Sequence, residues 1–478
     1  GNVSIAGTTD VNLPAGTSVG ISTLTLDGSG TLNGTWGSTT ATTATYKNNT
    51  YFDATTGYFT VANNTAATPV VTPTVGSYTY NRTAQGPNSA TNTGTGASYT
   101  YSYAGTGTTS YGPSSTAPTN AGTYSVTVTV ANSTDGFWRQ ASSAATAFTI
   151  AQKTLTITGL TGNNKVYDAT TTATTSGTAT LSGVVSPDAV TLGGTPVYTF
   201  ASRNVGTAIS IAASGYTISG ANAANYSLTQ PTGLSANITA RPLTITAAAN
   251  SKSYDGNTTS STVPTITSGA IQTGDVAAFT QTYDNKNVGT GKTMTASGVV
   301  TDGNSGNNYS YTFVTSTNGT ITGKSLTVTG ATTANKVYDA TTTASVTGGT
   351  LVGVVSPDVV TLTQAGSFAN ANVGTAKPIT ASCSISGADA GNYTLTQPTL
   401  IARDITARAL TITGAANSKT YDGNTSSATN PTITSGALQG SDVAAFTQTY
   451  DNKNVGTGKT MTPSGVVTDG NSGNNYSY

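Results

Sequence analysis

Short runs in which apolar and polar residues alternate recur along this chain of 478 residues. In the clearest run, Tyr124, Val126, Val128 and Val130 are separated by single polar residues, a period typical of a strand with one buried face. Clusters of Gly, Asn, Asp and Ser stand between the runs, and these residues favour turns. About seven such runs between residues 70 and 151 fit a small β-sandwich. The pattern predicts an all-β fold.

Four repeats of about 85 residues follow, and each contains the same three short motifs in the same order. The first motif is a Tyr-Asp pair, the second reads Asn-Val-Gly-Thr, and the third is an Asn-Tyr pair. The Tyr-Asp pairs begin at Tyr167, Tyr254, Tyr338 and Tyr421. The first and third repeats share the sequence Gly-Val-Val-Ser-Pro-Asp, whereas the second and fourth share Thr-Gln-Thr-Tyr-Asp-Asn-Lys. The repeats are therefore named A1, B1, A2 and B2.

The predicted organisation is a tandem array of Ig-like β-sandwich modules that forms an elongated rod. Its segments are an N-terminal Gly/Thr-rich β segment (1–66), an Ig-like sandwich (70–151), and the repeats A1 (152–240), B1 (241–323), A2 (324–407) and B2 (408–478). The N-terminal segment is interpreted either as the end of a β-helix or as a poorly covered sandwich. B2 lacks a counterpart of the closing strand that B1 carries between residues 312 and 322, so it is expected to have an unpaired sheet edge.

The boundaries between segments are short. Each has an Ile that closes one module and a Leu that opens the next, at Ile150/Leu155, Ile238/Leu243, Ile321/Leu326 and Ile405/Leu410. The four residues between the two apolar positions are too few to act as a flexible coil. We expect stiff, end-to-end modules.

Composition excludes several classes of function. Lys and Arg number 18, the 18 acidic residues are all Asp, and the chain has no His. Only 8% of the residues are charged, so no basic face is expected for nucleic acid or for an anionic membrane surface. No apolar run approaches the length of a membrane span. Gly1 begins within Gly/Thr-rich sequence with no signal peptide, so we expect a mature or interior piece of a longer protein.

Enzymatic chemistry is not predicted. Without His or Glu, the usual acid–base groups and the Ser-His-Asp and Cys-His arrangements are missing, and no catalytic or cofactor-binding residue is assigned. The best metal candidates are two Asp/Asn/Gly loops that offer oxygens to Ca²⁺. These candidates are Asp302, Asn304, Asn307, Asp469, Asn471 and Asn474. The same residue types are also the ordinary ones of turns, and we favour that interpretation.

Two further motifs have a structural interpretation beside a chemical one. Lys165 and Asp168 recur at the same spacing in every repeat, which predicts an ion pair or a hydrogen-bonded turn; the alternative is an intramolecular Lys–Asp or Lys–Asn amide crosslink. The Tyr of each Tyr-Asp pair is expected in the core with its hydroxyl held at a module end. Cys383, the single cysteine, is expected to be a small buried or half-buried residue rather than a reactive thiol.

The Lys-x-Tyr-Asp-(Ala/Gly) motifs and the later Asn-Val-Gly motifs resemble the repeat named for its Tyr-Asp-Gly sequence, which occurs in large secreted bacterial adhesins of the filamentous-haemagglutinin type. Residues 70–151 are similar to the Ig-like repeat called MBG in the same proteins, and residues 1–66 to the end of their β-helical shaft. The resemblance implies a surface-exposed or shed fibre, often exported by a two-partner route. It supplies no catalytic residues.

Three functions stay open at this point. The first is a stiff extracellular rod for cell-surface adhesion or matrix formation. The second is a filament subunit that polymerises head-to-tail by strand complementation. The third is an array of carbohydrate- or surface-binding modules. The expected partners are copies of the chain itself, through end-to-end or lateral β pairing, and host or matrix glycans.

Overall fold

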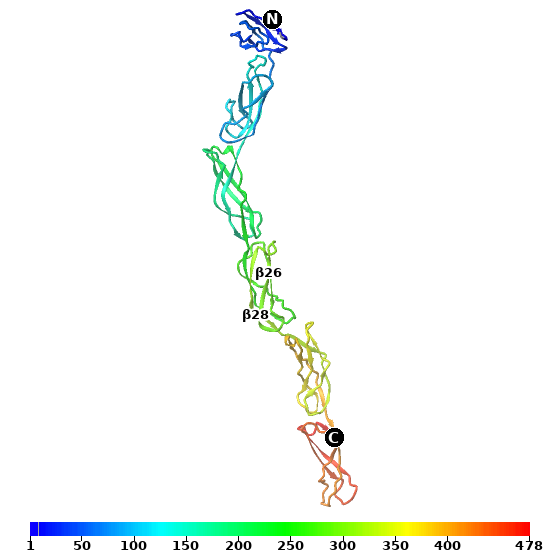
Figure 1. Cartoon of the computed structure of the whole chain (residues 1–478). Helices are drawn as coiled ribbons and strands as arrows, with labels where there is room; N and C mark the ends of the chain where they lie inside the picture. Colours follow the sequence, from blue (N-terminus) through cyan, green and yellow to red (C-terminus); the bar gives the residue numbers. More distant parts are fainter. Residues whose placement is uncertain (8) are drawn as a thin grey trace. The chain divides into compact units, whose positions relative to one another are not determined.

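A computed structural model describes residues 1–7 and 9–478, and the described chain is all-β (Figure 1). Two compact units make up the chain, Gly1–Thr239 and Ala240–Tyr478. Apart from strands, the described residues contain two single turns of 3-10 helix, η1 (Ala223–Asn225) and η2 (Ala390–Asn392). No helix among them is long and apolar enough to cross a membrane.

The N-terminal segment contains two small mixed sheets, ordered β1-β3-β4 and β2-β7-β5-β6. The strands are β1 (Asn2–Ile5), β2 (Ser18–Ile21), β3 (Thr23–Leu26), β4 (Ser29–Gly30), β5 (Gly34–Gly37), β6 (Tyr46–Lys47) and β7 (Tyr58–Val61). β1 pairs in parallel with β3, and β2 with β7, whereas β5 runs antiparallel to β7. Trp36 is fully buried in the core of this segment. The β-helix interpretation stays a prediction.

The next module contains seven strands in two sheets, ordered β10-β8 and β11-β12-β14-β9, with β13 paired to β12. The strands are β8 (Val71–Pro73), β9 (Tyr78–Thr79), β10 (Ala90–Asn92), β11 (Tyr99–Gly105), β12 (Gly122–Val130), β13 (Ala141–Ser142) and β14 (Thr146–Ala151). The alternating run lies on β12, where Tyr124, Val126, Val128 and Val130 are buried and the residues between them are not. The predicted strand is therefore confirmed.

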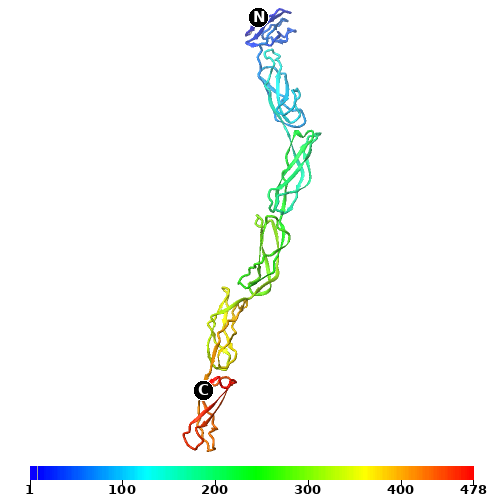
Figure 2. The same cartoon turned by 180° about the vertical axis from the view of Figure 1, so that it is seen from behind.

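Repeats A1 and B1 share one topology, a three-stranded sheet and a four-stranded sheet. In A1 the orders are β17-β15-β20 and β16-β21-β19-β18, and in B1 they are β24-β22-β27 and β23-β28-β26-β25. A1 consists of β15 (Lys153–Gly162), β16 (Lys165–Val166), β17 (Thr175–Ser182), β18 (Thr191–Phe200), β19 (Gly206–Ser219), β20 (Tyr226–Leu228) and β21 (Ser235–Thr239). B1 consists of β22 (Arg241–Thr246), β23 (Asn250–Ser253), β24 (Thr265–Ser268), β25 (Val276–Tyr283), β26 (Gly289–Thr301), β27 (Tyr309–Val314) and β28 (Ser316–Thr322). Figure 2 shows the same strands from behind.

Repeat A2 follows this plan in shorter pieces. Its strands are β29 (Lys324–Thr329), β30 (Thr332–Thr333), β31 (Lys336–Val337), β32 (Thr343–Ala344), β33 (Val346–Thr347), β34 (Thr350–Val352), β35 (Thr361–Thr363), β36 (Gly366–Phe368), β37 (Gly374–Lys377), β38 (Ile379–Ala381), β39 (Ser384–Ser386), β40 (Tyr393–Leu395) and β41 (Arg403–Thr406). The order β34-β29-β40 corresponds to the three-stranded sheets of A1 and B1. Cys383 is buried in this repeat, as predicted.

Repeat B2 has three two-stranded sheets, β42-β47, β43-β44 and β45-β46. The strands are β42 (Arg408–Ala409), β43 (Thr411–Thr413), β44 (Thr432–Ser435), β45 (Val443–Tyr450), β46 (Met461–Thr468) and β47 (Tyr476–Ser477). Within the described residues, B2 contains no counterpart of β28. The sheet that has four strands in B1 is reduced in B2 to the β45-β46 hairpin.

The apolar residues at the module boundaries are buried. Ile150 and Leu155 belong to one continuous core cluster that spans residues 71–226. Ile405 and Leu410 likewise belong to one cluster, which joins A2 to B2. Because only four residues connect the two apolar side chains and both are packed in the same core, these boundaries have little freedom to bend.

Candidate functional site at the module ends

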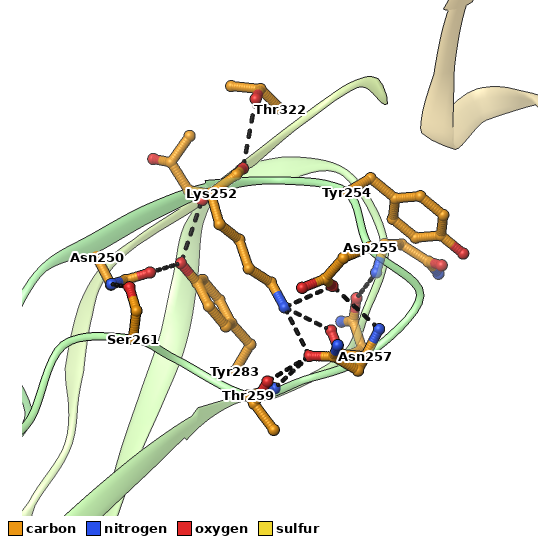
Figure 3. A network of polar contacts seen from close by, with 12 residues as sticks. Asn250, Lys252, Tyr254, Asp255, Asn257, Thr259, Ser261, Tyr283 and Thr322 are labelled. Atoms are coloured by element: carbon orange, nitrogen blue, oxygen red, sulfur yellow. Dashed lines mark hydrogen bonds and ion pairs between the residues drawn. The ribbon is translucent and has the colours of Figure 1, made fainter. Parts of the chain in front are cut away.

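The Lys and Asp beside each Tyr-Asp motif form the predicted ion pair. In B1, Lys252 Nζ lies 2.7 Å from Asp255 Oδ1 and also donates to the backbone carbonyl and side-chain oxygen of Asn257, both at 2.9 Å (Figure 3). The same ammonium lies 5.3 Å from the centre of the Tyr283 ring, a distance at which a cation–π contact is favourable. The other repeats have equivalent pairs, Lys165–Asp168, Lys336–Asp339 and Lys419–Asp422.

This ion pair closes a turn. The Asp255 side chain is 45% exposed, and it also accepts a hydrogen bond from the backbone N–H of Asn257. Amide formation between Lys and a carboxamide or carboxylate needs a neutral amine and a buried acid as proton shuttle, and an exposed carboxylate paired with a charged lysine provides neither. The arrangement favours the ion-pair interpretation over a crosslink.

A second site lies where one module meets the next, and its centre is a buried aspartate. Where B1 meets A2, Asp358 accepts hydrogen bonds from the hydroxyls of Tyr254 of B1 at 2.7 Å and Tyr393 of A2 at 2.6 Å, both on Oδ2. Its Oδ1 lies 3.0 Å from Lys286 Nζ of B1. The Asp358 side chain is only 1% exposed. The two phenol rings meet edge to face, with centroids 5.4 Å apart.

The same construction, here called the junction site, occurs at two other boundaries within the two units. Asp188 accepts from Tyr80 of the preceding module at 2.7 Å and from Tyr226 of A1 at 2.6 Å, and Arg82 lies 3.5 Å away. Asp442 of B2 accepts from Tyr338 of A2 at 2.9 Å and from Tyr476 of B2 at 2.7 Å. In A2 the position of Lys286 is taken by Ala371, and Arg408 instead donates to the carbonyl of Tyr338.

The Asn of three Asn-Tyr pairs completes the junction site of its module boundary. Asn392 Oδ1 accepts the backbone N–H of Val288 in the preceding module at 3.0 Å. Asn225 accepts from Ala121 at 2.8 Å in the same way, and Asn475 from Val373 at 2.9 Å. All three motifs that define the repeat therefore contribute atoms to contacts between modules.

The pKa shifts reflect this hydrogen bonding. Burial and the hydrogen bond to Asp188 raise the pKa of Tyr80 to about 12, and burial and the bond to Asp358 do the same for Tyr393. Desolvation by itself would raise the pKa of Asp358, but the bonds from Tyr393, Tyr254 and Lys286 outweigh it and lower that pKa. The pKa of Asp188 is lowered as well, chiefly by the hydrogen bond from Tyr226. At neutral pH the carboxylates of Asp188 and Asp358 are therefore charged, and each accepts hydrogen bonds from two neutral tyrosine hydroxyls.

The predicted buried Tyr with a hydroxyl held at a module end is found at Tyr254 and Tyr338, which are 1% and 3% exposed and donate to Asp358 and Asp442. Tyr167 is also fully buried. Tyr421, at the same position of B2, is instead 58% exposed. Tyr254 and Tyr338 are packed against Tyr393 and Tyr476 of the next module in the chain.

The two loops considered for Ca²⁺ are turns whose carboxylate oxygens accept backbone hydrogen bonds. Asp302 Oδ1 accepts the backbone N–H groups of Asn304 and Gly306, and Oδ2 accepts that of Asn308, at 2.7–3.0 Å. Asn307 donates to the carbonyl of Asn304. Asp469, Asn471 and Asn474 repeat this pattern in B2. These backbone bonds lower the pKa of Asp302 although desolvation opposes them, so the turn interpretation accounts for both carboxylate oxygens.

Sequence reasoning missed the acceptors of the junction site. Asp188 and Asp358 stand at the end of the Gly-Val-Val-Ser-Pro-Asp motif, which was noted only as a subtype marker, and Asp442 stands in Gly-Ser-Asp. A usable signal was present, since these aspartates recur at the same interval as the Tyr-Asp pairs. What periodicity does not reveal is that the tyrosine and its acceptor belong to different modules.

The comparison with known proteins agrees with the repeats. The sequence model of the YDG domain matches four segments, residues 151–233, 239–318, 322–400 and 406–478. They coincide with the four repeats and cover well over half of the chain. No curated protein and no solved structure matches significantly.

Proposed function

This chain belongs to the YDG domain family, and from that premise we propose that it is a non-enzymatic stalk segment of an extracellular fibre. In this proposal the repeats act as a spacer, and other parts of the fibre attach to the target surface. The resemblance to secreted bacterial adhesins of the filamentous-haemagglutinin type supports a location outside the cell, at a bacterial surface.

The junction site is the observation that carries the proposal. At three boundaries, residues of the repeat motifs form contacts between modules, and Asp188, Asp358 and Asp442 each join tyrosines of two neighbours. A buried carboxylate is costly unless donors reach it, and Asp358, which is 1% exposed, receives donors from both modules. Asp188 Oδ1 has no hydrogen-bond partner and lies 3.5 Å from Arg82 Nε. Such a site therefore favours one relative placement of two modules over all others, which is the property a stalk needs.

The charge of the chain supports a neutral structural role. Equal numbers of acidic and basic residues, 18 of each, give no basic face for nucleic acid. The glycans and additional copies of the chain expected as partners require no such face, and both remain part of the proposal.

Electron microscopy of the full chain tests the stalk. We expect the angle between B1 and A2, and between A2 and B2, to have a narrow distribution. In a chain that carries Asp358→Ala and Asp442→Ala, both distributions should broaden because each junction loses its shared acceptor. A chain with the exposed Asp10→Ala is the control. Equal distributions in all three chains, or native chains that fold back into compact particles, would contradict the proposal.

A further inference from the structure

A cavity of about 310 Å³ lies between the N-terminal segment and the module of residues 70–151, inside the unit Gly1–Thr239. Its lining contains no charged residue and includes Ser29, Gly30, Thr65, Ala67, Phe137 and Trp138. Ligand sites have volumes of about 300–1,000 Å³, so this cavity has room for a single small ring. The aromatic side chains, the uncharged lining and the size together restrict the ligand.

The wall formed by the N-terminal segment is a tight hairpin. Asp27 and Gly28 are the two turn residues between β3 and β4, and both have positive φ angles, 47° and 79°. Two-residue turns of this kind match the twist of the strands and fix the hairpin. Gly30 packs directly on the backbone of Thr65, where a Cβ would lie only 1.7 Å from the carbonyl oxygen. Ser29 also lines the cavity and is exposed, so its hydroxyl is accessible to a ligand.

The second wall comes from the loop between β12 and β13, which packs on the N-terminal segment. The Phe137 ring lies 5.7 Å from the Trp36 ring, centroid to centroid, at the core of that segment. Ala67 donates its backbone N–H to the carbonyl of Phe137 at 3.1 Å, and its own carbonyl accepts the N–H of Arg139 at 2.9 Å. Both backbone groups of Ala67 are therefore used, and this wall offers no strand edge to a peptide.

Trp138 stands in the second wall as a supported aromatic surface. Its backbone N–H donates to Ser133 Oγ at 3.0 Å, and its carbonyl accepts the N–H of Ser133 at 3.0 Å. Gly94, which does not line the cavity, lies against the indole, because a Cβ there would come within 2.6 Å of a ring atom. The fully buried Trp36 donates its indole N–H to the carbonyl of Leu32 at 2.9 Å. The half-buried Trp138, in contrast, donates its indole N–H to no acceptor within residues 1–7 and 9–478.

A neutral sugar ring matches this lining better than other small rings do. The axial C–H bonds of a pyranose carry partial positive charge and stack on the electron-rich face of an indole, and its hydroxyls bond with an indole N–H and a serine hydroxyl. A nucleotide or another phosphorylated ligand would need a cation, which the lining does not contain. A uronic acid would bring a carboxylate to a cavity without a partner for it.

We propose that this cavity binds one pyranose residue of a neutral, β-linked glycan, stacked on Trp138 and hydrogen-bonded by the Trp138 indole N–H and the Ser29 hydroxyl. The β linkage is favoured because an equatorial substituent leaves the C–H face of the ring flat. This contact goes beyond the stalk proposal, because it lies on the spacer itself and is additional to attachment by other parts of the fibre.

The test uses the full chain with ¹⁵N-labelled tryptophan. The chain has two tryptophans, so the spectrum contains one indole N–H signal from Trp138 and one from Trp36. Cellotetraose, as a matrix-type glucan, and N-acetyllactosamine, as a host-type glycan, are titrated separately. At least one of them should shift the Trp138 signal saturably with a Kd of about 1–10 mM, the strength of a contact limited to one ring. The Trp36 signal should stay unchanged, and the glycan that binds identifies the source.

Two variants, measured by ligand-observed NMR, test the geometry. Trp138→Ala removes the stacking surface and the donor and should weaken binding at least about tenfold. Ala67→Leu puts a larger side chain at an exposed position of the lining and should weaken binding as much with Trp138 in place. Ala62→Leu, at an exposed alanine of the same segment outside the lining, is the matched control. The Trp36 signal in each variant shows whether the segment is still folded.

The proposal is overturned if neither glycan shifts the Trp138 signal at about ten times the expected Kd. It is also overturned if Trp138→Ala and Ala67→Leu bind as tightly as Ala62→Leu. A stronger response to oligogalacturonate than to the two neutral glycans would contradict a neutral ligand. Binding concerns this cavity alone, whereas the stalk proposal is tested by the angles between later modules, so the failure of one is distinguishable from the failure of the other.

Discussion

The hydroxyl of Tyr254 offers a direct test of the junction site. Tyr254→Phe keeps the ring packed against Tyr393 and removes the 2.7 Å hydrogen bond to Asp358 together with the hydroxyl's contact with Lys286. A hydrogen bond to a charged group contributes about 1.5–3 kcal/mol. Asp358 keeps its bonds to Tyr393 and Lys286, so the junction should weaken without unfolding either module. Opening of the junction should therefore become roughly 10- to 150-fold more frequent.

The backbone N–H of Val288 reports this opening, because it donates to Asn392 across the same junction. Its hydrogen exchange should accelerate by the same factor in Tyr254→Phe. Exchange at one amide is preferable to a denaturation midpoint, since a chain of several modules does not unfold in two states. The amide of Val373, which donates to Asn475 at the next junction, serves as an internal reference and should not change.

Tyr421→Phe is the matched control, because this tyrosine holds the same position in B2 and is 58% exposed. Removing an exposed hydroxyl should leave exchange at Val288 unaltered. The reasoning is refuted if Tyr254→Phe changes exchange at Val288 less than about twofold, a value well below the range expected for a charged hydrogen bond. Equal acceleration in the two variants would also refute it.

Three further predictions concern pH, calcium and crosslinking. The pKa of Asp358 is lowered in the folded chain, so the stability that its carboxylate adds to the junction is present above the ordinary Asp pKa and is lost as pH falls through the lower folded value. Opening of the junction should therefore increase between about pH 5 and pH 2 and stay constant from pH 6 to 8. The measurement is the protection of the Val288 amide, corrected for the pH dependence of intrinsic exchange. Asp302→Ala leaves three backbone N–H groups without their acceptor and should destabilise B1 by about 1–3 kcal/mol. Neither excess Ca²⁺ nor a chelator should shift the thermal unfolding of the native chain. A shift caused by the chelator would restore the calcium interpretation. Intact mass spectrometry should give the mass of the uncrosslinked sequence, whereas a loss of one water per Lys252–Asp255 pair would reveal an amide bond.

Much of the fold follows from local pattern. The alternation at Tyr124 to Val130 predicts β12 because a strand places every second side chain on one face. The Lys252–Asp255 pair was predictable for a similar reason, since both partners lie within three residues on one turn. The Ile405 and Leu410 boundary was predicted as a short connection between two modules, whereas the structure shows that both side chains lie in one core cluster.

Only the tertiary structure decided which residues meet across a junction. Tyr338 and Asp442 are 104 residues apart and bond only because one module stands on the next, and no short-range period encodes that pairing. The same limit explains Tyr421 and Tyr450, whose local sequences match those of Tyr254 and Tyr283 although one side chain is exposed and the other has an unpaired hydroxyl. The sequence determines which polar and aromatic side chains stand at the ends of each module. The neighbouring strand and module determine whether such a side chain is buried and hydrogen-bonded, because burial and hydrogen bonding depend on the atoms that pack against that side chain.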